Sequence, residues 1–483
     1  MFTEAFKKQA NKTTTENGMP ALVSTKSAVV DFFYKAGGMR GQDGIEGVFL
    51  DAYQEDPAAA LVLAFWLRDV RGGAGERQLF RQLLAHLAET SPNVLTARFL
   101  SLVPEYGRWD DLLILHKYIE VWDRVIYIIG NALLGKKDAL CAKWMPRKGD
   151  LAVKLRKDLG FTPKQYRKVL VELTKVVETQ MCAKNWNKIK FEQVPSLAHS
   201  RYTNAFNRNS SAYQAYKAKL QKGETEIKAG AVYPYDIVKS VLRSNDRTIA
   251  NKQWEALSNY IGDASILPMV DVSGSMGCSV GGTLTAMDVA ISLGIYCAEK
   301  NEGKFKGICL TFSEIPTFVH LKSKDLLNNV NKMRSANWGM NTDFIKALDS
   351  VLDMAVRNKV KQKHMPKTLL VLSDMQFDEA QDYSGWYNAG HVDKLDKTAM
   401  KEIKSRYKAA GYKAPNVVFW NLRDAGNVPA KKNDAGVALV SGFSPAIMKH
   451  VLADTLENLT PTAIVAEVIN SDRYASVRDA IAA

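Results

Sequence analysis

Five oxygen-bearing side chains occur where apolar segments of the chain give way to polar ones. Asp271, Ser273 and Ser275 come at every second position after an apolar run, in the stretch MVDVSGSMG. Because alternate positions of an extended segment point the same way, these three groups can converge on one point. Thr342 stands in the glycine-containing stretch NWGMNTDF, and Asp374 ends the apolar run TLLVLSD. This all-oxygen set suits a hard divalent cation, Mg²⁺ first, with Mn²⁺ or Ca²⁺ as alternatives.

The same residues also have an ordinary structural interpretation, since Ser and Asp are common helix N-caps and turn residues. A lone DxSxS pattern arises by chance in any long chain. Here it follows a predicted strand and precedes a predicted helix, and the threonine loop and the second strand-end aspartate come in a consistent order. The combination favours a metal site over a set of capping residues.

The second half of the chain is expected to supply the sheet that positions these residues. The apolar runs SILPMVDVS, KGICLTFS, KTLLVLSDM and PNVVFWNL alternate with helical stretches such as TAMDVAISLGIYCAEK. This alternation predicts a doubly wound α/β domain with a mostly parallel sheet. Ligands of such sheets bind at the carboxyl ends of the strands, where DxSxS and Asp374 stand.

The first half has the pattern of successive amphipathic helices, among them PAAALVLAFWLRDVRG and GERQLFRQLLAHLAE. Helix pairs joined by short turns predict an all-α array of stacked hairpins. The pattern changes near residues 258–264. We therefore expect a two-part α plus α/β protein, with a helical array over residues 1–262 and an α/β domain over residues 263–483.

Composition narrows the class of protein. The chain has 483 residues, contains no apolar run long enough to cross a bilayer, and begins without the pattern of a secretory leader. Its five cysteines are scattered and form no CxxC pair. These features predict a reduced, cytoplasmic protein with no membrane segment. The absence of GxSxG, HExxH and Cys–His signatures, and of a general base near the candidate metal ligands, predicts that it is not an enzyme.

The net charge of +14 is concentrated in one stretch of the chain. Residues 1–262 hold 39 basic and 27 acidic residues (+12), whereas residues 263–483 hold 26 and 24 (+2). Residues 131–230 alone hold 21 basic and 8 acidic residues, or +13. Such a concentration favours a polyanionic partner, most often nucleic acid, over a basic face that only aids solubility.

Candidate RNA-contacting residues come from this basic stretch as a group, because basic side chains neutralise phosphates and interleaved aromatics stack on unpaired bases. For any single member, a solvated lysine or a core aromatic is the simpler interpretation. The candidates are Lys143, Arg147, Lys148, Lys154, Arg156, Lys157, Lys164, Arg167, Lys168, Lys184, Lys188, Lys190, His199, Arg201 and Arg208.

The metal-site residues resemble those of the von Willebrand factor A domain and its metal-ion-dependent adhesion site. Asp271, Ser273 and Ser275 match the first motif, Thr342 the second and Asp374 the third. The resemblance implies a bound metal with an open position that an acidic side chain of a protein partner completes. Such a site binds a partner and does not hydrolyse a substrate.

The order of the two halves resembles the Ro autoantigen and its bacterial relatives. In that family a HEAT-like helical-repeat array, the TROVE module, precedes an A domain, and the resemblance implies binding of structured RNA. The stretches DVRGGAGERQLF and VPEYGRWDDLL are more similar to a TROVE-like family of phage, plant and fungal proteins.

The function that the sequence predicts is a non-catalytic, RNA-binding ribonucleoprotein scaffold whose A domain binds a partner through Mg²⁺. The alternative is a protein-interaction scaffold or virion-associated assembly factor that acts through the metal site without RNA. A metal-dependent hydrolase is a third class, for which no base or substrate pocket is evident. The oligomeric state and the identity of the RNA stay open.

Overall fold

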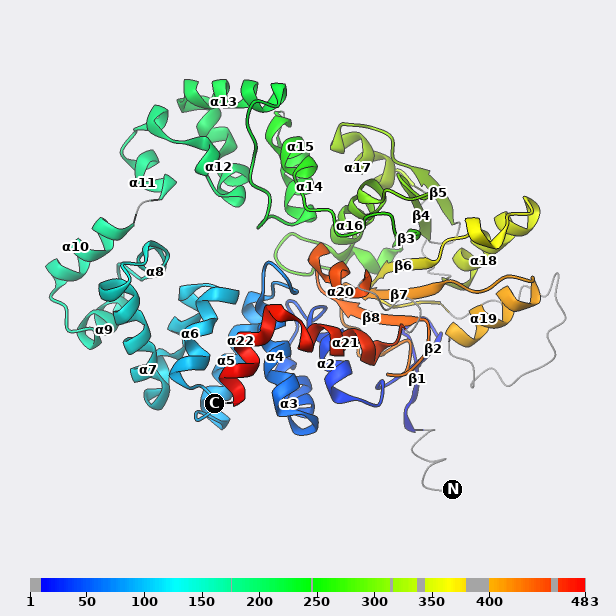
Figure 1. Cartoon of the computed structure of the whole chain (residues 1–483), viewed down its shortest axis with the longest axis horizontal. Coiled ribbons are helices and arrows are strands. Elements are labelled where there is room, and N and C mark those ends of the chain that lie inside the picture. The colour runs from blue at the N-terminus through cyan, green and yellow to red at the C-terminus, as the bar shows by residue number, and fades with distance from the viewer. Residues whose placement is uncertain are drawn as a thin grey trace. The chain divides into compact units, whose positions relative to one another are not determined.

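The computed structural model describes residues 10–174, 176–244, 246–312, 316–336, 344–378, 399–452 and 459–482. Contacts within the chain define two compact units (Figure 1). The sheet unit comprises Met1–Ala60, Tyr233–Leu242 and Asn259–Asn470. The helical unit comprises Leu61–Val232, Arg243–Ser258 and Ser471–Ala483.

A six-stranded sheet in the order β5-β4-β3-β6-β7-β8 forms the centre of the sheet unit. The strands are β3 (Ile266–Asp271), β4 (Ile308–Phe312), β5 (Thr317–His320), β6 (Thr368–Ser373), β7 (Asn416–Asn421) and β8 (Val437–Ser441). Neighbours pair in parallel except β4 and β5, which are antiparallel. The alternation of apolar runs and helical stretches thus predicts the fold of this region correctly.

The other elements of the sheet unit are a hairpin and a set of helices. The hairpin strands are β1 (Lys12–Thr14) and β2 (Pro20–Leu22). The helices are α2 (Ala28–Ala36), α3 (Ile45–Glu55), α14 (Pro234–Arg243), α16 (Ala286–Lys300), α17 (Leu326–Arg334), α18 (Phe344–Arg357), α19 (Ala399–Ala409), α20 (Met448–Leu452) and α21 (Pro461–Asn470). Helix α4 (Pro57–Arg68) begins in this unit and continues into the helical unit.

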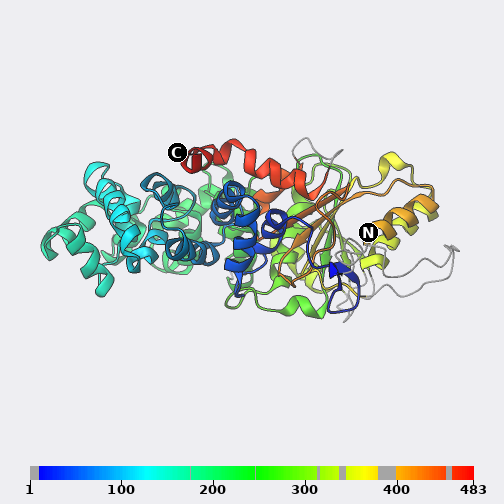
Figure 2. The same ribbon diagram turned by 90° about the horizontal axis from the view of Figure 1, so that it is seen from below.

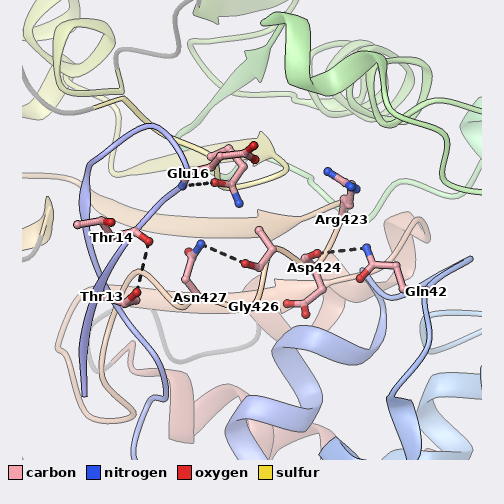
Figure 3. Close-up of a pocket in the computed structure, with 10 residues that line it drawn as sticks. Thr13, Thr14, Glu16, Gln42, Arg423, Asp424, Gly426 and Asn427 are labelled. Atoms are coloured by element: carbon pink, nitrogen blue, oxygen red, sulfur yellow. Dashed lines mark hydrogen bonds between the residues drawn. The ribbon is translucent and has the colours of Figure 1, made fainter. Parts of the chain in front are cut away.

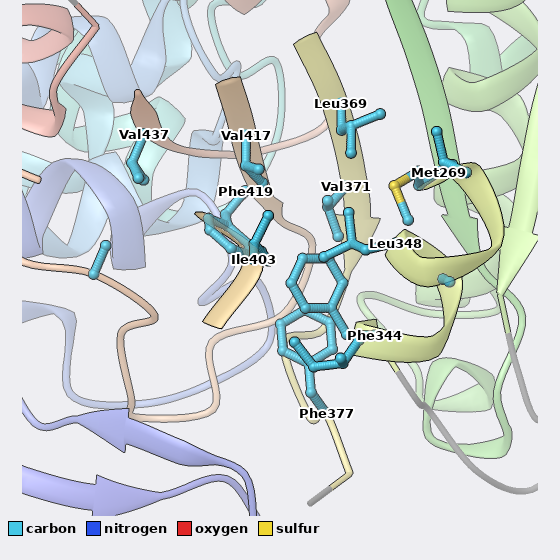
Figure 4. Packing of buried hydrophobic residues seen from close by; sticks show 14 of the residues in the cluster. Met269, Phe344, Leu348, Leu369, Val371, Phe377, Ile403, Val417, Phe419 and Val437 are labelled. Carbon is cyan, nitrogen blue, oxygen red and sulfur yellow. The ribbon is translucent and has the colours of Figure 1, made fainter. Parts of the chain in front are cut away.

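Helices pack on both faces of the sheet. Successive residues of a strand point to opposite faces, so the buried strands present apolar side chains on both. On one face Met269 of β3 belongs to an apolar cluster with Leu348 of α18 and Ile403 of α19 (Figure 4). On the other face α16 lies so close that a Cβ atom on Gly294 would be 2.4 Å from Val270 Cγ2. A larger residue at position 294 would push this helix away from the strand.

The described N-terminal segment, residues 12–55, packs with the sheet. The hydroxyl of Ser441, the last residue of β8, donates to Phe33 O of α2 at 2.8 Å and accepts from Gly37 N at 3.0 Å. A Cβ atom on Gly37 would lie 2.6 Å from Gly442 N. The compact units therefore do not coincide with the division between residues 262 and 263 that the sequence pattern suggests.

The helical unit contains helices and no strand among its described residues. After α4 it comprises α5 (Arg77–Thr90), α6 (Ala97–Tyr106), α7 (Ile119–Gly130), α8 (Ala139–Trp144), α9 (Asp150–Asp158), α10 (Pro163–Leu173), α11 (Val177–Cys182), α12 (Ser196–Asn209), α13 (Ser211–Lys222), α15 (Thr248–Glu255) and α22 (Ala475–Ala482). They can be followed by colour in Figures 1 and 2. The expected helical character is confirmed for this unit, whereas residues 12–22 of the predicted array contain the hairpin β1–β2.

Local sequence explains where several of these helices begin. Thr162 accepts from Gln165 N, and the Gln165 side chain accepts from Thr162 N, which forms a capping box with Pro163 in the first turn. Thr96 caps α6 by accepting from Phe99 N. Within the described part of the chain, no helix is both long enough and apolar enough to span a membrane.

Candidate metal centre and basic helical surface

The two predicted carboxylates meet at one edge of the sheet. Strands β3 and β6 are parallel neighbours, with Met269 opposite Val371. Asp271 ends β3 and Asp374 directly follows β6, so both lie at the carboxyl ends of adjacent strands. Both are fully buried. The structure therefore brings together residues that are about a hundred positions apart in the sequence.

Hydrogen bonds hold the first motif in place. Asp271 Oδ1 accepts from Ser273 N at 2.9 Å, and the Oγ atoms of Ser273 and Ser275 are 3.1 Å apart. Ser275 also lies near Asp374, where its hydroxyl opposes the rise in the pKa of that carboxyl. Four of the five predicted ligands thus lie together. Thr342, the fifth, is outside the residues that the structure describes.

Ser373 is a member of this network that sequence reasoning missed. Its hydroxyl donates to Asp271 Oδ2 at 2.6 Å and accepts from Met375 N at 2.9 Å. As the last residue of β6, it sits beside Asp271 only because β3 and β6 are neighbours. A hydroxyl next to a predicted strand-end carboxylate was the one signal available in the sequence.

The surroundings of the two carboxylates disfavour their charged forms. Burial, and secondarily the charge of Asp374, raise the pKa of Asp271 to about 7, against hydrogen bonds from Ser373 and Ser273. Burial also raises the pKa of Asp374, although Gln376 N, Ser275 and the charge of Arg423 oppose the shift. Among the described residues, Asp374 Oδ2 is buried without a hydrogen-bond partner. A bound cation would neutralise both carboxylates.

The residues fit a hard cation by their chemistry. The donors are two buried carboxylates and two serine hydroxyls, all oxygen, as Mg²⁺ prefers. Across the described ranges no group of three or more His, Cys, Asp or Glu side chains is placed to hold a metal. The candidate site is of the mixed carboxylate–hydroxyl type, because its donors are two carboxylates and two hydroxyls, and water or a partner would complete the coordination.

The hairpin β1–β2 holds the segment that follows Asp374. The hydroxyl of Thr15 donates to Phe377 O, and Glu16 N donates to Gln376 Oε1 at 2.6 Å. Asn17 Nδ2 donates to Gln376 O at 2.9 Å. Nothing in the sequence predicts that this hairpin supports the site, because these bonds join residues about 360 positions apart.

Most of the predicted basic residues lie on the surface of the helical unit. Those exposed are Arg147, Lys148, Lys154, Lys157, Lys164, Arg167, Lys168, Lys184, Lys188, Lys190, Arg201 and Arg208, while Lys143 and Arg156 are half-buried. Their ion pairs are exposed, such as Lys154 with Asp158 at 3.1 Å and Lys168 with Glu172 at 3.8 Å. Exposed pairs of this kind are weak, so the cations remain available to a partner.

His199 does not belong to this surface. It is fully buried, its Nε2 lies 2.9 Å from Phe191 O, and its ring stacks on Tyr213 and Tyr216. Burial lowers the pKa of His199 to about 4, so the ring is neutral near pH 7. The prediction that it contacts RNA is wrong, because it sits on the inner face of α12. The exposed Arg201 comes from the same helix.

Fold and site together define a protein with an all-α unit and a parallel-sheet unit that carries a carboxylate–hydroxyl site at its strand ends. Residues 265–479 match the family model "Domain of unknown function (DUF7788)". Residues 15–125 and 152–267 match "Domain of unknown function (DUF2828)". The chain is 30% identical to "Uncharacterized protein L728" of Acanthamoeba polyphaga mimivirus over 525 residues, which cover 95% of this chain and 87% of that protein. The chain belongs to the family of this mimivirus protein.

Among solved structures, the crystal structure of the Deinococcus radiodurans RO (RSR) protein is similar to this chain. The similarity covers 92% of this chain and 99% of that chain, at 16% identity and a TM-score of 0.45. Similarity at this level supports no inference about function.

Proposed function

We propose that the protein is a non-catalytic RNA-binding scaffold that binds phosphates through the basic surface of its helical unit. The observation that carries the proposal is the +13 charge of residues 131–230, from 21 basic and 8 acidic residues, most of whose basic side chains are exposed. A polyanion that neutralises these charges releases counterions, which supplies sequence-independent affinity.

Exposed apolar side chains in the same unit favour RNA as the partner over a polyanion that has no bases. Ile119 is 84% exposed, Tyr127 65%, Leu140 62% and Val171 61%. Aromatic and aliphatic groups among cations favour single-stranded or looped RNA, whose unpaired bases can stack on them. Tyr127 of α7 is the side chain best suited to stacking, because its ring is largely solvent-exposed.

In the same proposal, the candidate metal centre binds a protein partner. Asp271, Ser273, Ser275 and Asp374 would hold Mg²⁺, which would supply an electrophilic open position for a partner's carboxylate. The buried, unpartnered Asp374 Oδ2 supports this interpretation within the described part of the chain. Because these carboxylates act as ligands, the proposal assigns them no role as a general base.

The RNA test replaces Lys154, Lys157, Lys164 and Arg167 by Gln, which removes four exposed charges from α9 and α10. Affinity for a labelled single-stranded RNA should fall roughly a hundredfold near physiological salt. The slope of log affinity against log salt should become shallower by about 0.7 for each phosphate that the variant no longer neutralises. Fluorescence anisotropy across a salt titration measures both quantities.

A matched control removes four exposed lysines from the sheet unit instead: Lys322, Lys324, Lys361 and Lys367. This variant has the same net charge as the first, so it separates a local surface from overall charge. If both variants lose affinity equally, or if neither changes the salt slope, the helical unit is not the RNA-binding surface.

The second candidate function is a protein-interaction scaffold that acts through the metal centre without RNA. The observation that favours it is the pair of buried carboxylates, which a partner-bound metal would stabilise. An absorbance ratio typical of pure protein after mild purification would support it over RNA binding. A partner that stays bound both in EDTA and to the Asp271→Ala variant would exclude a role for the metal.

A further inference from the structure

A polar cavity of about 540 Å³ lies in the sheet unit beside the candidate metal centre (Figure 3). Thr13, Thr14 and Glu16 of the hairpin line one side, and Gln42 and the segment 423–427 after β7 line the other. Its volume is in the range of small-molecule sites, about 300–1,000 Å³. It is also at the carboxyl edge of the sheet, where ligands of doubly wound folds bind.

One part of the cavity offers hydrogen-bond donors. Among the described residues, the half-buried guanidinium of Arg423 forms no ion pair or hydrogen bond, and only its backbone N donates, to Asn421 Oδ1. The buried side chain of Gln376 accepts from Glu16 N through Oε1, which leaves its NH₂ group without a partner in the described part of the chain. A cation beside an amide NH₂ is suited to a carboxylate.

Another part offers acceptors. Asp424 Oδ1 is buried and has no hydrogen-bond partner among the residues described. The backbone of Asp424 is fixed, because its N donates to Gly38 O at 2.9 Å and its O accepts from Gln42 Nε2 at 3.1 Å. Glu16 adds an exposed carboxylate. These acceptors are suited to an ammonium group.

The remaining lining excludes other ligand classes. Its described residues include no aromatic and no large apolar side chain, so a nucleobase would find nothing to stack on. The lining holds two carboxylates and one guanidinium, a balance of charge that disfavours a polyanion. A ligand that satisfies all of these groups carries both a positive and a negative charge within a small volume.

We propose that this cavity binds a small zwitterion of the α-amino-acid type, with its carboxylate on Arg423 and the Gln376 amide and its ammonium on Asp424 and Glu16. The site is separate from the proposed RNA surface and does not depend on it. The hairpin that forms one wall also holds the segment after Asp374, so occupancy would stabilise the metal centre next to it.

The test is isothermal titration calorimetry of the full chain with each common amino acid in turn. At least one amino acid should bind, and acetate or methylammonium alone should bind at least roughly tenfold more weakly, since each satisfies half of the site. Arg423→Gln and Asp424→Asn should each weaken binding by roughly tenfold or more. The Arg357→Gln variant should not change it, since Arg357 is 80% exposed and is not among the residues that line the cavity.

Circular dichroism of each variant checks folding, and Glu16→Gln gives a second test on an exposed residue. The proposal is overturned if no amino acid produces a heat of binding at millimolar concentration. It is also overturned if Arg423→Gln, Asp424→Asn and Glu16→Gln all leave the affinity unchanged, or if acetate or methylammonium binds as tightly as the amino acid. RNA affinity of the same variants should be unchanged, so failure here is distinguishable from failure of the proposed function.

Discussion

The guanidinium of Arg473 binds both carboxylate oxygens of Asp69, although 404 residues separate them in the sequence. Its Nε lies 2.8 Å from Oδ2 and its Nη2 lies 3.0 Å from Oδ1. Asp69 is fully buried and also accepts from Tyr474 OH at 3.3 Å, while Tyr106 OH donates to Arg473 O at 2.7 Å. This cluster makes the C-terminal helix α22 part of the helical unit.

We expect Arg473→Gln to lower the free energy of unfolding by about 3 kcal/mol, the lower end of the range for breaking a buried ion pair. The lower end applies because Arg473 is 33% exposed, whereas Asp69, which would keep its charge, is buried. Urea denaturation followed by circular dichroism measures the change. Arg357→Gln, which breaks the exposed pair with Asp353, is the control and should cost less than about 0.5 kcal/mol.

The lowered pKa of His199 predicts that the free energy of unfolding depends on pH. Its pKa is lowered to about 4 in the folded protein, so the unfolded chain takes up the proton first as the pH falls. The histidine does not affect stability above its ordinary pKa of about 6.5, and it destabilises the fold progressively between that pH and about 4. The full loss is about 3 kcal/mol.

The measurement is the free energy of unfolding from pH 7 to pH 4 for the wild type and His199→Phe. The variant should be less dependent on pH over this interval, because phenylalanine cannot take up a proton. His86→Phe, which changes another histidine of the same unit, is the control. Equal slopes for His199→Phe and the wild type would show that the ring titrates normally.

Metal binding should stabilise the sheet unit. If Mg²⁺ binds the folded chain alone, a free concentration of about 100 Kd adds about 2.7 kcal/mol to the free energy of unfolding. Asp374→Asn should abolish most of this increment, because it removes a buried carboxylate ligand. Thermal unfolding in Mg²⁺ and in EDTA gives the difference, and an equal midpoint in the two conditions would argue against a metal site.

The hairpin β1–β2 should influence the metal centre from outside it. Thr15→Val keeps the size of the side chain but removes its bonds with Phe377 O and Met19 N. We expect a loss of about 1–2 kcal/mol in stability, from about 1 kcal/mol for each hydrogen bond. Mg²⁺ affinity should fall as well, because the segment after Asp374 loses a restraint.

Thr14→Val is the matched control for that variant, since Thr14 directly precedes Thr15 in the chain but is exposed. Titration of Mg²⁺ followed by intrinsic fluorescence gives the affinity of each protein. A Thr15→Val variant that is less stable but binds Mg²⁺ normally would show that the hairpin supports the fold and not the site.

Local pattern in the sequence predicts the kind of each region correctly. Short apolar runs indicate the parallel strands, and amphipathic spacing indicates the helices, because both depend on residues close in sequence. The same locality explains why the candidate site could be predicted: Asp271, Ser273 and Ser275 are two apart, and Asp374 follows a strand of the same sheet. The polar groups at those strand ends are therefore recognisable without knowledge of the strand order.

Sequence pattern alone is enough to predict the helical and sheet regions, the strand-end carboxylates and the concentration of basic charge. The packing of residues 12–55 with the sheet, and of α22 with the helices, is evident only from three-dimensional contacts. The same holds for the contact between Ser373 and Asp271 and for the burial of His199. These outcomes depend on contacts between residues far apart in the chain, or on which helix face finds a partner, and local periodicity encodes neither.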